Sequence, residues 1–264
     1  MEARKIVDAY HWQRELGNNV IQTPHGRIVK NATVPDVWDA NHASAVTAKH
    51  PDDIETFLGD VERHLSHTSW RVIHTDPFTP EPFIARLALD GYAEQPATIQ
   101  MVLSEKLRPA YGGDISPVET EGDWQSLAAL VHRDHEEGAR TSGNILPPSV
   151  TDDIIAGYRA KSGPYRFHIA RIDGEPAAYG ALVAAPSGAG MIEDLFTLPA
   201  YRKRGIASAL IAQFSTTLEE RGCTSIFLGA MVGEQARHLY AKLGFRPAML
   251  TRCWVRRATS GNLE

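Results

Sequence analysis

The chain has 264 residues, with 27 Lys and Arg against 32 Asp and Glu, a net charge of −5 that disfavours a general nucleic-acid-binding protein. Cys223 and Cys253 are too few for a disulfide framework or a Cys-rich zinc site, and no apolar run approaches the ~20 residues that cross a bilayer. The amphipathic, charged first residues are unlike a secretory signal, so we expect a soluble cytoplasmic protein.

The first half of the chain predicts helices and strands without a catalytic motif. In chain order we expect an acidic helix, a strand, a helix that ends in a Gly-aromatic pair, and another strand, at residues 51–67, 70–74, 82–92 and 98–103. The next stretch, Arg108 to Pro117, contains two prolines and two adjacent glycines, which indicates a linker. We therefore predict two domains, 1–110 and 111–264.

The second half predicts strands and helices more clearly. Apolar residues at helical spacing predict helices at 123–137 and 150–159. Strands follow at 165–172, 177–184 and 191–198, and the Asp173-Gly174 pair predicts an antiparallel hairpin between the first two. Because side chains alternate along a strand, we expect Glu193 and Asp194 to face opposite sides of the third strand.

A basic turn after Pro199 leads directly into a helix. The sequence Tyr201-Arg-Lys-Arg-Gly-Ile-Ala207 precedes a helix with an apolar face. The first four N–H groups of a helix have no internal acceptor, and the helix dipole places positive charge there. Such a turn can bind a pyrophosphate, and Gly205 would let the phosphate oxygens approach the amides because it has no Cβ.

Two motifs in this half resemble the GCN5-related N-acetyltransferase (GNAT) superfamily. Arg202-x-x-Gly205-x-Ala207, directly after a strand, is similar to the family's acyl-CoA signature Gln/Arg-x-x-Gly-x-Gly/Ala. The segment from Tyr240 to Phe245 resembles a family helix that ends in Tyr-x-x-x-Gly-Phe. The resemblance covers about residues 115–257. It implies an α/β (α+β) fold with a mixed, mostly antiparallel sheet flanked by helices.

The resemblance implies acetyl-CoA, or another acyl-CoA, as co-substrate and no metal. In family members one strand splays from its neighbour and pairs with the pantetheine arm, a role that falls here on Leu195, Phe196 and Thr197. Many relatives carry Asn seven residues before the tyrosine, where this chain has Gly233, which puts one side-chain contact to that arm in doubt. The pyrophosphate would lie on the turn formed by Arg202, Lys203, Arg204, Gly205, Ile206, Ala207 and Ser208.

The resemblance also implies direct acyl transfer to an amine in a ternary complex. Tyr240 is the candidate proton donor to the departing thiolate, because the family places this phenol near the cofactor sulfur. The alternative role for Tyr240 is packing between helix and sheet. Glu193 is the candidate general base, acting directly or through water, and the alternative role for Glu193 is that of an ion-pair partner.

The order strand, helix, Gly-aromatic, strand also occurs at the end of the first half. Gly91-Tyr92 corresponds to Gly244-Phe245, but Leu87 stands at the position that matches Tyr240. No Arg-x-x-Gly-x-Ala turn precedes this segment. We infer a tandem arrangement, in which the first domain is a degenerate GNAT-like domain and the second is the acyl-CoA-binding catalytic GNAT domain.

Two polar clusters are candidates for the acceptor site. The first is either part of a pocket at a domain interface or a capped helix start, and consists of Trp38, Asp39, Asn41 and His42. The second lies on the helix at 123–137, where His132 and His135 have a spacing that could ligate a metal, although a solvated helix face is the favoured interpretation. Because this helix borders the acceptor site in the family, the residues expected near substrate are His135, Glu136 and Arg140.

Three functions remain open at this point. The first is an acyl-CoA-dependent N-acyltransferase, most often an acetyltransferase, that acts on a small-molecule or peptide amine. The second is a catalytically silent acyl-CoA-binding protein. The third is a GNAT-fold transferase that takes its acyl group from an aminoacyl-tRNA, which the acidic charge balance disfavours although the basic turn forms a local patch. We expect no membrane partner and a monomer or homodimer.

Overall fold

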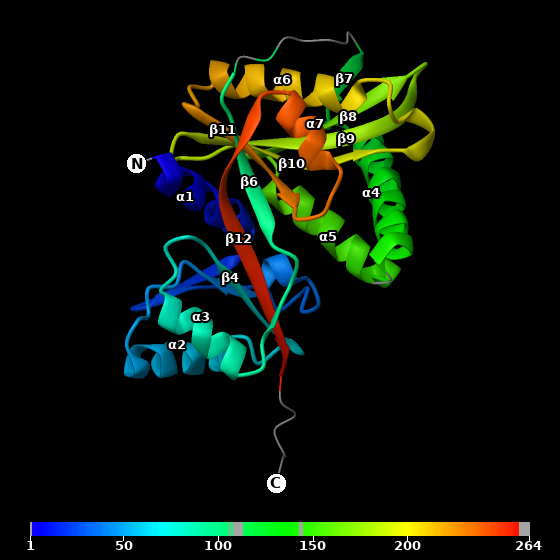
Figure 1. The fold of residues 1–264 in the computed structure, drawn as a ribbon. Coiled ribbons are helices and arrows are strands. Elements are labelled where there is room, and N and C mark those ends of the chain that lie inside the picture. The colour runs from blue at the N-terminus through cyan, green and yellow to red at the C-terminus, as the bar shows by residue number, and fades with distance from the viewer. Residues whose placement is uncertain (1, 106, 108–112, 143–144, 259–264) are drawn as a thin grey trace. The chain divides into compact units, whose positions relative to one another are not determined.

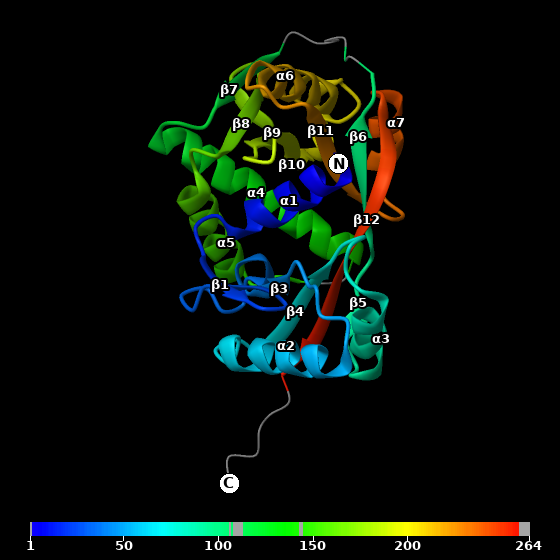
Figure 2. The same ribbon diagram turned by 90° about the vertical axis from the view of Figure 1, so that its left-hand side faces the viewer.

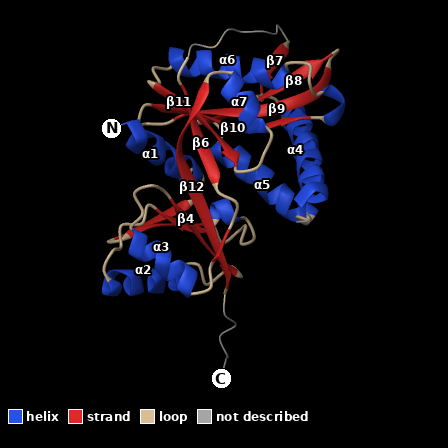
Figure 3. Ribbon diagram, viewed as in Figure 1, coloured by secondary structure: helices blue, strands red, loops and turns tan. Residues whose placement is uncertain are grey.

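The structure is a computed structural model that describes residues 2–105, 107, 113–142 and 145–258. Helices and strands are interspersed along the chain (Figures 1 and 3). The helices are α1 (Glu2–Glu15), α2 (Pro51–His64), α3 (Glu81–Leu89), α4 (Glu121–Ser142), α5 (Pro148–Lys161), α6 (Ile206–Glu220) and α7 (Ala236–Lys242), with 3-10 turns η1 (Trp38–Ala40) and η2 (Pro199–Tyr201). The strands are β1 (Asn19–Thr23), β2 (Gly26–Lys30), β3 (His42–Ser44), β4 (Trp70–Thr75), β5 (Ala93–Glu94), β6 (Thr98–Leu103), β7 (Asp114–Pro117), β8 (Tyr165–Ile172), β9 (Glu175–Ala184), β10 (Ala189–Thr197), β11 (Ser225–Met231) and β12 (Phe245–Arg257).

The chain divides into two compact units. The first unit comprises Met1–Gln13, Gln100–Ala230 and Glu234–Ala248, and the second comprises Arg14–Ile99, Met231–Gly233 and Met249–Glu264. This division differs from a single boundary between residues 110 and 111, because most of β6 belongs to the first unit and most of β12 to the second. Residues 108–112 of the predicted linker lie outside the described residues, whereas residues 114–117 form strand β7, paired with β8, rather than a linker. No helix in the described part of the chain is long and apolar enough to cross a membrane.

The first unit is built on a mixed sheet in which β6, β11, β10, β9, β8 and β7 lie side by side in that order. Strand β10 is parallel to β11 and antiparallel to β9, while β9 with β8 and β8 with β7 are antiparallel. The predicted Asp173-Gly174 hairpin is confirmed. Both residues have positive φ, 53° and 85°, as a tight turn that matches the strand twist requires.

Helices cover both faces of this sheet (Figure 1). Helix α6 packs on β9 and β10, and α4 packs on the opposite face of β9 with α5 beside it. Close packing of α6 depends on small residues in the strands, because a Cβ on Gly180 would stand 3.0 Å from Phe214 of α6. The structure therefore confirms the predicted mixed, mostly antiparallel sheet flanked by helices.

The second unit contains a sheet with the order β1-β2-β3-β4-β12, and β5 pairs with β12. Helices α2 and α3 lie on one face of it (Figure 2). Phe57 of α2 and Phe83 of α3 pack with Ile73 of β4 and Trp254 of β12 in a buried apolar core. Burial of this set of large side chains is the main favourable term that holds the unit together.

The predicted Gly-aromatic pairs have the same local geometry in both halves. Helix α3 is followed by Gly91 with φ 77° and buried Tyr92, and α7 is followed by Gly244 with φ 90° and buried Phe245. A left-handed glycine ends each helix, and the next aromatic ring enters the core. This repetition supports the inference of a tandem chain.

Candidate active site

Strands β10 and β11 separate halfway along β10. Their parallel register runs from Ala189 opposite Ser225 to Ile192 opposite Leu228, whereas β10 continues to Thr197. On its other side, β10 remains paired with β9 as far as Thr197 opposite Ala178. Among the described residues, the segment 195–197 therefore has no partner in the register with β11. Such an edge can accept an extended ligand as an additional strand.

A β-bulge lies where the two strands separate. The register of β10 with β9 shifts by one residue between Glu193 and Phe196. Within the bulge, Asp194 has φ 53°, which is uncommon for a residue with a Cβ and which Asp tolerates better than most. The bulge therefore changes the direction of β10 at the start of its open segment.

The bulge overturns the expectation that Glu193 and Asp194 face opposite sides of the strand. Asp194 accepts a hydrogen bond from the hydroxyl of Tyr165, at 2.6 Å. Glu193 also raises the pKa of Tyr165, so both carboxylates lie near one phenol. The expectation was wrong because the extra residue interrupts strict alternation.

The basic turn that precedes α6 presents unpaired amides. Within the described residues, the backbone N–H groups of positions 203–208 donate to no protein acceptor. Gly205 has φ 82° and immediately precedes helical Ile206, a combination that forms anion-binding concavities. A Cβ on Gly205 would meet no atom within 4 Å, so the space in front of the turn is open. The turn therefore has the free amides and the open space that a pyrophosphate site needs, and the binding of a pyrophosphate there stays a prediction.

The first arginine of the turn is held by the protein. Arg202 donates from Nε to the carbonyl oxygen of Thr197 at 2.9 Å and pairs with both carboxylate oxygens of Glu137 at 2.6 and 2.7 Å. A two-pronged guanidinium–carboxylate contact fixes orientation as well as charge. Arg202 thus links α4 to the end of β10, whereas Lys203 and Arg204 remain exposed to solvent.

Glu193 acts electrostatically on the buried phenol of Tyr240. Tyr240 lies on α7 with 7% of its surface exposed, and no hydrogen bond of its hydroxyl occurs among the described residues. Burial raises the pKa of Tyr240 well above its ordinary value, and Glu234 and Glu193 raise it further. The phenol is therefore protonated at neutral pH, as a proton donor must be.

The sequence did not point to the carboxylate of Asp134, on the helix that packs against β9. Asp134 of α4 accepts a hydrogen bond from the hydroxyl of Tyr179 at 2.7 Å. The pKa of Asp134 is raised to about 6, and burial is the largest cause. The carboxylates of Asp194 and Glu137 also raise this pKa, whereas Tyr179 and Arg202 lower it. Tyrosines inside apolar strands were the available signal, because a buried phenol requires a polar partner.

The histidines of α4 join two helices. His132 lies 2.9 Å from the carboxylate of Asp152, and His135 Nδ1 lies 2.8 Å from the hydroxyl of Thr151, both on α5. Within the described residues, no group of three or more potential ligands is placed to hold a metal ion. Contacts of His135, Glu136 and Arg140 with substrate stay a prediction.

The polar cluster of the first half has partners inside the second unit. Asn41 is buried, accepts a hydrogen bond from the amide of Asn31 at 2.9 Å, and donates to the carbonyl oxygen of Val34 at 2.8 Å. Trp38 packs edge-on against Trp70, with ring centroids 5.4 Å apart. These contacts give Asn41 and Trp38 structural roles, but among the described residues no side chain caps the start of η1, so the expected capped helix start is not seen. An acceptor-binding role for Asp39 and His42 stays a prediction.

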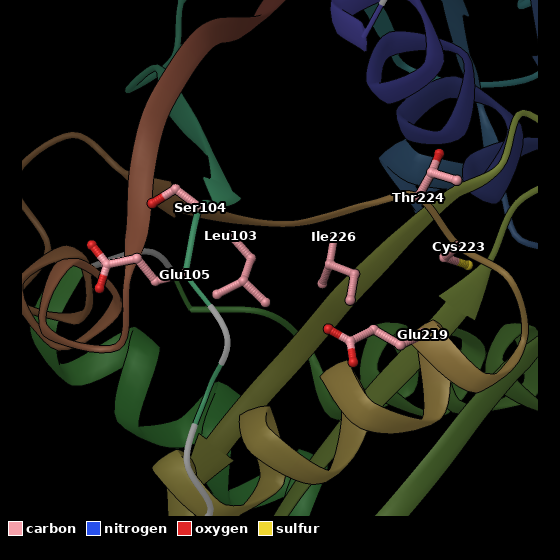
Figure 4. A pocket seen from close by; sticks show the side chains of 7 residues that line it. All are labelled: Leu103, Ser104, Glu105, Glu219, Cys223, Thr224 and Ile226. Carbon is pink, nitrogen blue, oxygen red and sulfur yellow. The ribbon is translucent and has the colours of Figure 1, made fainter.

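A surface pocket of about 250 Å³ lies elsewhere in the first unit (Figure 4). Its lining residues come from the ends of β6 and α6 and the start of β11, and are Leu103, Ser104, Glu105, Glu219, Cys223, Thr224 and Ile226. None of them is a predicted cofactor or catalytic residue. Its two carboxylates also make it unsuited to an anionic ligand.

The acetyltransferase (GNAT) family matches residues 124–245. This part of the chain belongs to the GNAT family. It contains the splayed strand, the bulge, the basic turn and Tyr240. The match confirms the resemblance on which the predicted site residues depend, whereas the role of each residue stays a prediction.

Known relatives and solved structures agree with this assignment. The chain is 29% identical over 121 residues to an uncharacterized N-acetyltransferase of Mycobacterium tuberculosis strain H37Rv, a match that covers 41% of this chain and 78% of that protein. The fold resembles a GCN5-related N-acetyltransferase from Kribbella flavida, with a TM-score of 0.69, 16% identity, and coverage of 97% of this chain and 96% of that one. It also resembles a tandem GNAT protein from the clavulanic acid biosynthesis pathway, with a TM-score of 0.60, 13% identity, and coverage of 92% and 83%. These GNAT folds extend over both halves of the chain.

Proposed function

We propose that this GNAT protein is an N-acetyltransferase that moves an acetyl group from acetyl-CoA to an amine by direct transfer. The observation that carries the proposal is the row of unpaired amides at positions 203–208, directly after a strand whose edge is open at 195–197. An anion is stabilised by free N–H groups at a helix start, and a flexible amide-containing arm can pair with a strand edge. Acetyl-CoA has both an anionic pyrophosphate and a flexible arm that contains amides.

The basic turn and the open strand edge fit different parts of this co-substrate. The amides of the turn, with Gly205 at the closest approach, would hold the pyrophosphate. The edge of Leu195, Phe196 and Thr197 would bind the pantetheine arm. When bound, acetyl-CoA supplies an activated acyl group. Arg202 would stabilise the turn from behind rather than contact phosphate, because Glu137 and Thr197 occupy its guanidinium.

Two side chains manage the protons of the transfer. The C–N bond to the acceptor forms as the C–S bond of the thioester breaks. Glu193 removes one proton from the acceptor ammonium, directly or through water, and later releases it to solvent. Tyr240 gives its phenolic proton to the departing sulfur, and the second proton that the nitrogen loses as it becomes an amide restores the phenol of Tyr240. After burial and Glu234, the charge of Glu193 also raises the pKa of Tyr240, which supports a role for both groups in one site. Transfer of the acceptor proton to Glu193 would weaken that effect.

A turnover assay tests the proposal. The chain is incubated with acetyl-CoA and spermidine, kanamycin, L-lysine or poly-L-lysine, while free thiol and acetylated amine are measured. We expect both products for at least one amine, with ~100-fold slower transfer at pH 7 in Glu193→Gln and a smaller deficit at pH 9, where more of the amine is already deprotonated. The control Glu175→Gln alters an exposed carboxylate at the start of β9 and should keep wild-type turnover.

Three outcomes of this assay have different meanings. Thiol release without acetylated amine, or neither product with any amine, would contradict the proposed transfer. Binding of acetyl-CoA without either product would favour the silent acyl-CoA-binding alternative. Equal turnover in the wild type and Glu193→Gln at both pH values would remove Glu193 from the mechanism but leave the transfer itself.

A further inference from the structure

Two tyrosines hold the carboxylate at the bulge of β10. Asp194 accepts a hydrogen bond from Tyr158 of α5 at 3.2 Å on Oδ1 and from Tyr165 of β8 at 2.6 Å on Oδ2. We call these three residues the bulge clamp. The two donors come from different elements, so the clamp attaches the bulge both to strand β8 of the same sheet and to helix α5.

The tyrosines of the clamp are themselves fixed. Tyr158 and Tyr165 are 8% and 3% exposed, and their rings stack with centroids 6.4 Å apart. The ring centroids of Phe167 and Tyr158 are 4.5 Å apart. Lys161 Nζ lies 5.7 Å from the ring centroid of Tyr158 and 5.1 Å from that of Tyr165. Buried side chains with this many contacts lose little further freedom when they donate a hydrogen bond.

The bulge needs such support. A residue with a Cβ at φ 53° persists only when its surroundings hold it there. The register shift also directs Leu195 to the α6 face, where its Cδ2 would meet a Cβ on Gly180 at 2.8 Å. The position of the open edge at 195–197 therefore depends on the geometry of Asp194.

We propose that Asp194 is a positioning residue, whose carboxylate, held by Tyr158 and Tyr165, fixes the β10 bulge so that residues 195–197 present their open edge to the thioester arm. The functional part of this inference, that the edge receives the thioester arm, rests on the proposed function. The structural part, that the clamp fixes the bulge, concerns the ligand-free chain. The carboxylate acts through the backbone of the bulge and does not need to contact the reacting atoms.

Hydrogen exchange in the ligand-free chain tests the structural part. Asp194→Gly can adopt positive φ but has no carboxylate, whereas Asp194→Asn tolerates that φ and keeps one acceptor oxygen. We expect exchange in peptides covering 193–198 to rise ~10-fold in Asp194→Gly and to stay within ~3-fold of wild type in Asp194→Asn. Wild-type exchange in Asp194→Gly would overturn the proposal, because it would show that backbone conformation alone suffices.

Two further variants separate the clamp from general stability. Tyr165→Phe removes one donor and should raise exchange in 193–198, with no additional rise when it is combined with Asp194→Gly, because both changes remove the same contact. Tyr179→Phe removes a similar phenol–carboxylate bond, the 2.7 Å contact with Asp134, and should leave exchange in 193–198 unchanged. Equal effects of both phenylalanine variants would contradict a specific clamp.

Kinetics test the functional part. Relative to wild type, Asp194→Gly should lower kcat ~10-fold or more and raise the Kd for CoA by a smaller factor, because the displaced edge holds the pantetheine arm less well while the turn at 203–208 is intact. Asp194→Asn should restore most of kcat. Parallel losses of kcat, CoA affinity and thermal stability would show a merely structural role. A wild-type chain that fails to bind acetyl-CoA would refute the proposed function, and the exchange data would still decide whether the clamp fixes the bulge.

Discussion

Tyr240 has the properties of a proton donor and lacks those of an ordinary core phenol. A core tyrosine gives its hydroxyl to a neighbour, as Tyr179 gives its own to Asp134. Tyr240 is also buried, yet its hydroxyl makes no hydrogen bond within the part of the chain that the structure describes. This contrast favours a catalytic role for Tyr240 over a packing role.

Tyr240→Phe tests this role at the level of one oxygen atom. We expect kcat to fall ~100-fold or more, as is typical for loss of a general acid, with little change in the Kd for acetyl-CoA. Tyr92→Phe makes the same chemical change in the second unit, where the ring lies under Arg256, and should leave kcat unchanged. Unchanged turnover of Tyr240→Phe across the pH range would make the residue structural.

The carboxyl of Asp134 should make stability depend on pH. Burial raises the pKa of Asp134 from 3.8 to about 6, so the charged form is disfavoured in the folded chain. The protonated carboxyl of Asp134 makes its full favourable contribution to the free energy of unfolding below pH 3.8. That contribution is lost as the pH rises through 6. Asp134→Asn keeps an acceptor for Tyr179 and removes the charge.

Thermal unfolding checks the prediction for Asp134. The Tm of Asp134→Asn should exceed that of wild type at pH 8, by the equivalent of up to ~3 kcal/mol, and the gap should close toward pH 4. A lower Tm of the variant at pH 8, or an equal gap at both pH values, would show that the carboxylate is stabilised by its neighbours when charged.

At the scale of elements, α6 carries a glycine in the same conformation at each end. Gly205 precedes the helix and Gly222 follows it, both with φ 82° and both with no atom within 4 Å of an added Cβ. A side chain at either position strains the backbone without a clash inside the protein. Only at Gly205 would it occupy the space in front of the free amides.

Gly205→Glu and Gly222→Glu therefore form a matched pair. Each should destabilise the chain by ~1–2 kcal/mol, the cost of a left-handed residue with a Cβ. The Kd for acetyl-CoA, measured by calorimetry, should rise ~100-fold or more in Gly205→Glu, because a carboxylate would replace the phosphate at a helix start, and should stay at the wild-type value in Gly222→Glu. Equal affinities of the two variants would mean that the turn is not the phosphate site.

At the scale of the whole molecule, sequence reasoning predicted what local patterns encode. The Asp173-Gly174 hairpin, the turn with Gly205 and the Gly-aromatic pairs are each determined by a few neighbouring residues. The bulge at Asp194 was not predicted, because it exists only in the register of β10 with β9. Most of β12 belongs to the second unit, because it pairs with β4 from the other half of the chain. This assignment also depends on long-range pairing, which periodicity does not encode.

The two halves differ at the helix start that would bind phosphate. Helix α2 begins with Pro51, which has no N–H, and carries Asp52 and Asp53 in its first turn. Helix α6 has no acidic residue in its first turn and follows a basic turn. Negative charge at a helix N-terminus repels a second anion. We therefore expect a single acyl-CoA site per chain, at the start of α6.

Calorimetric titration of the wild-type chain with acetyl-CoA is the most direct test of this account. We predict saturable binding with one site per chain. Two sites per chain would contradict the assignment of the N-terminal half as degenerate, and the absence of binding would contradict the proposal that the amides at positions 203–208 hold the pyrophosphate of a thioester co-substrate.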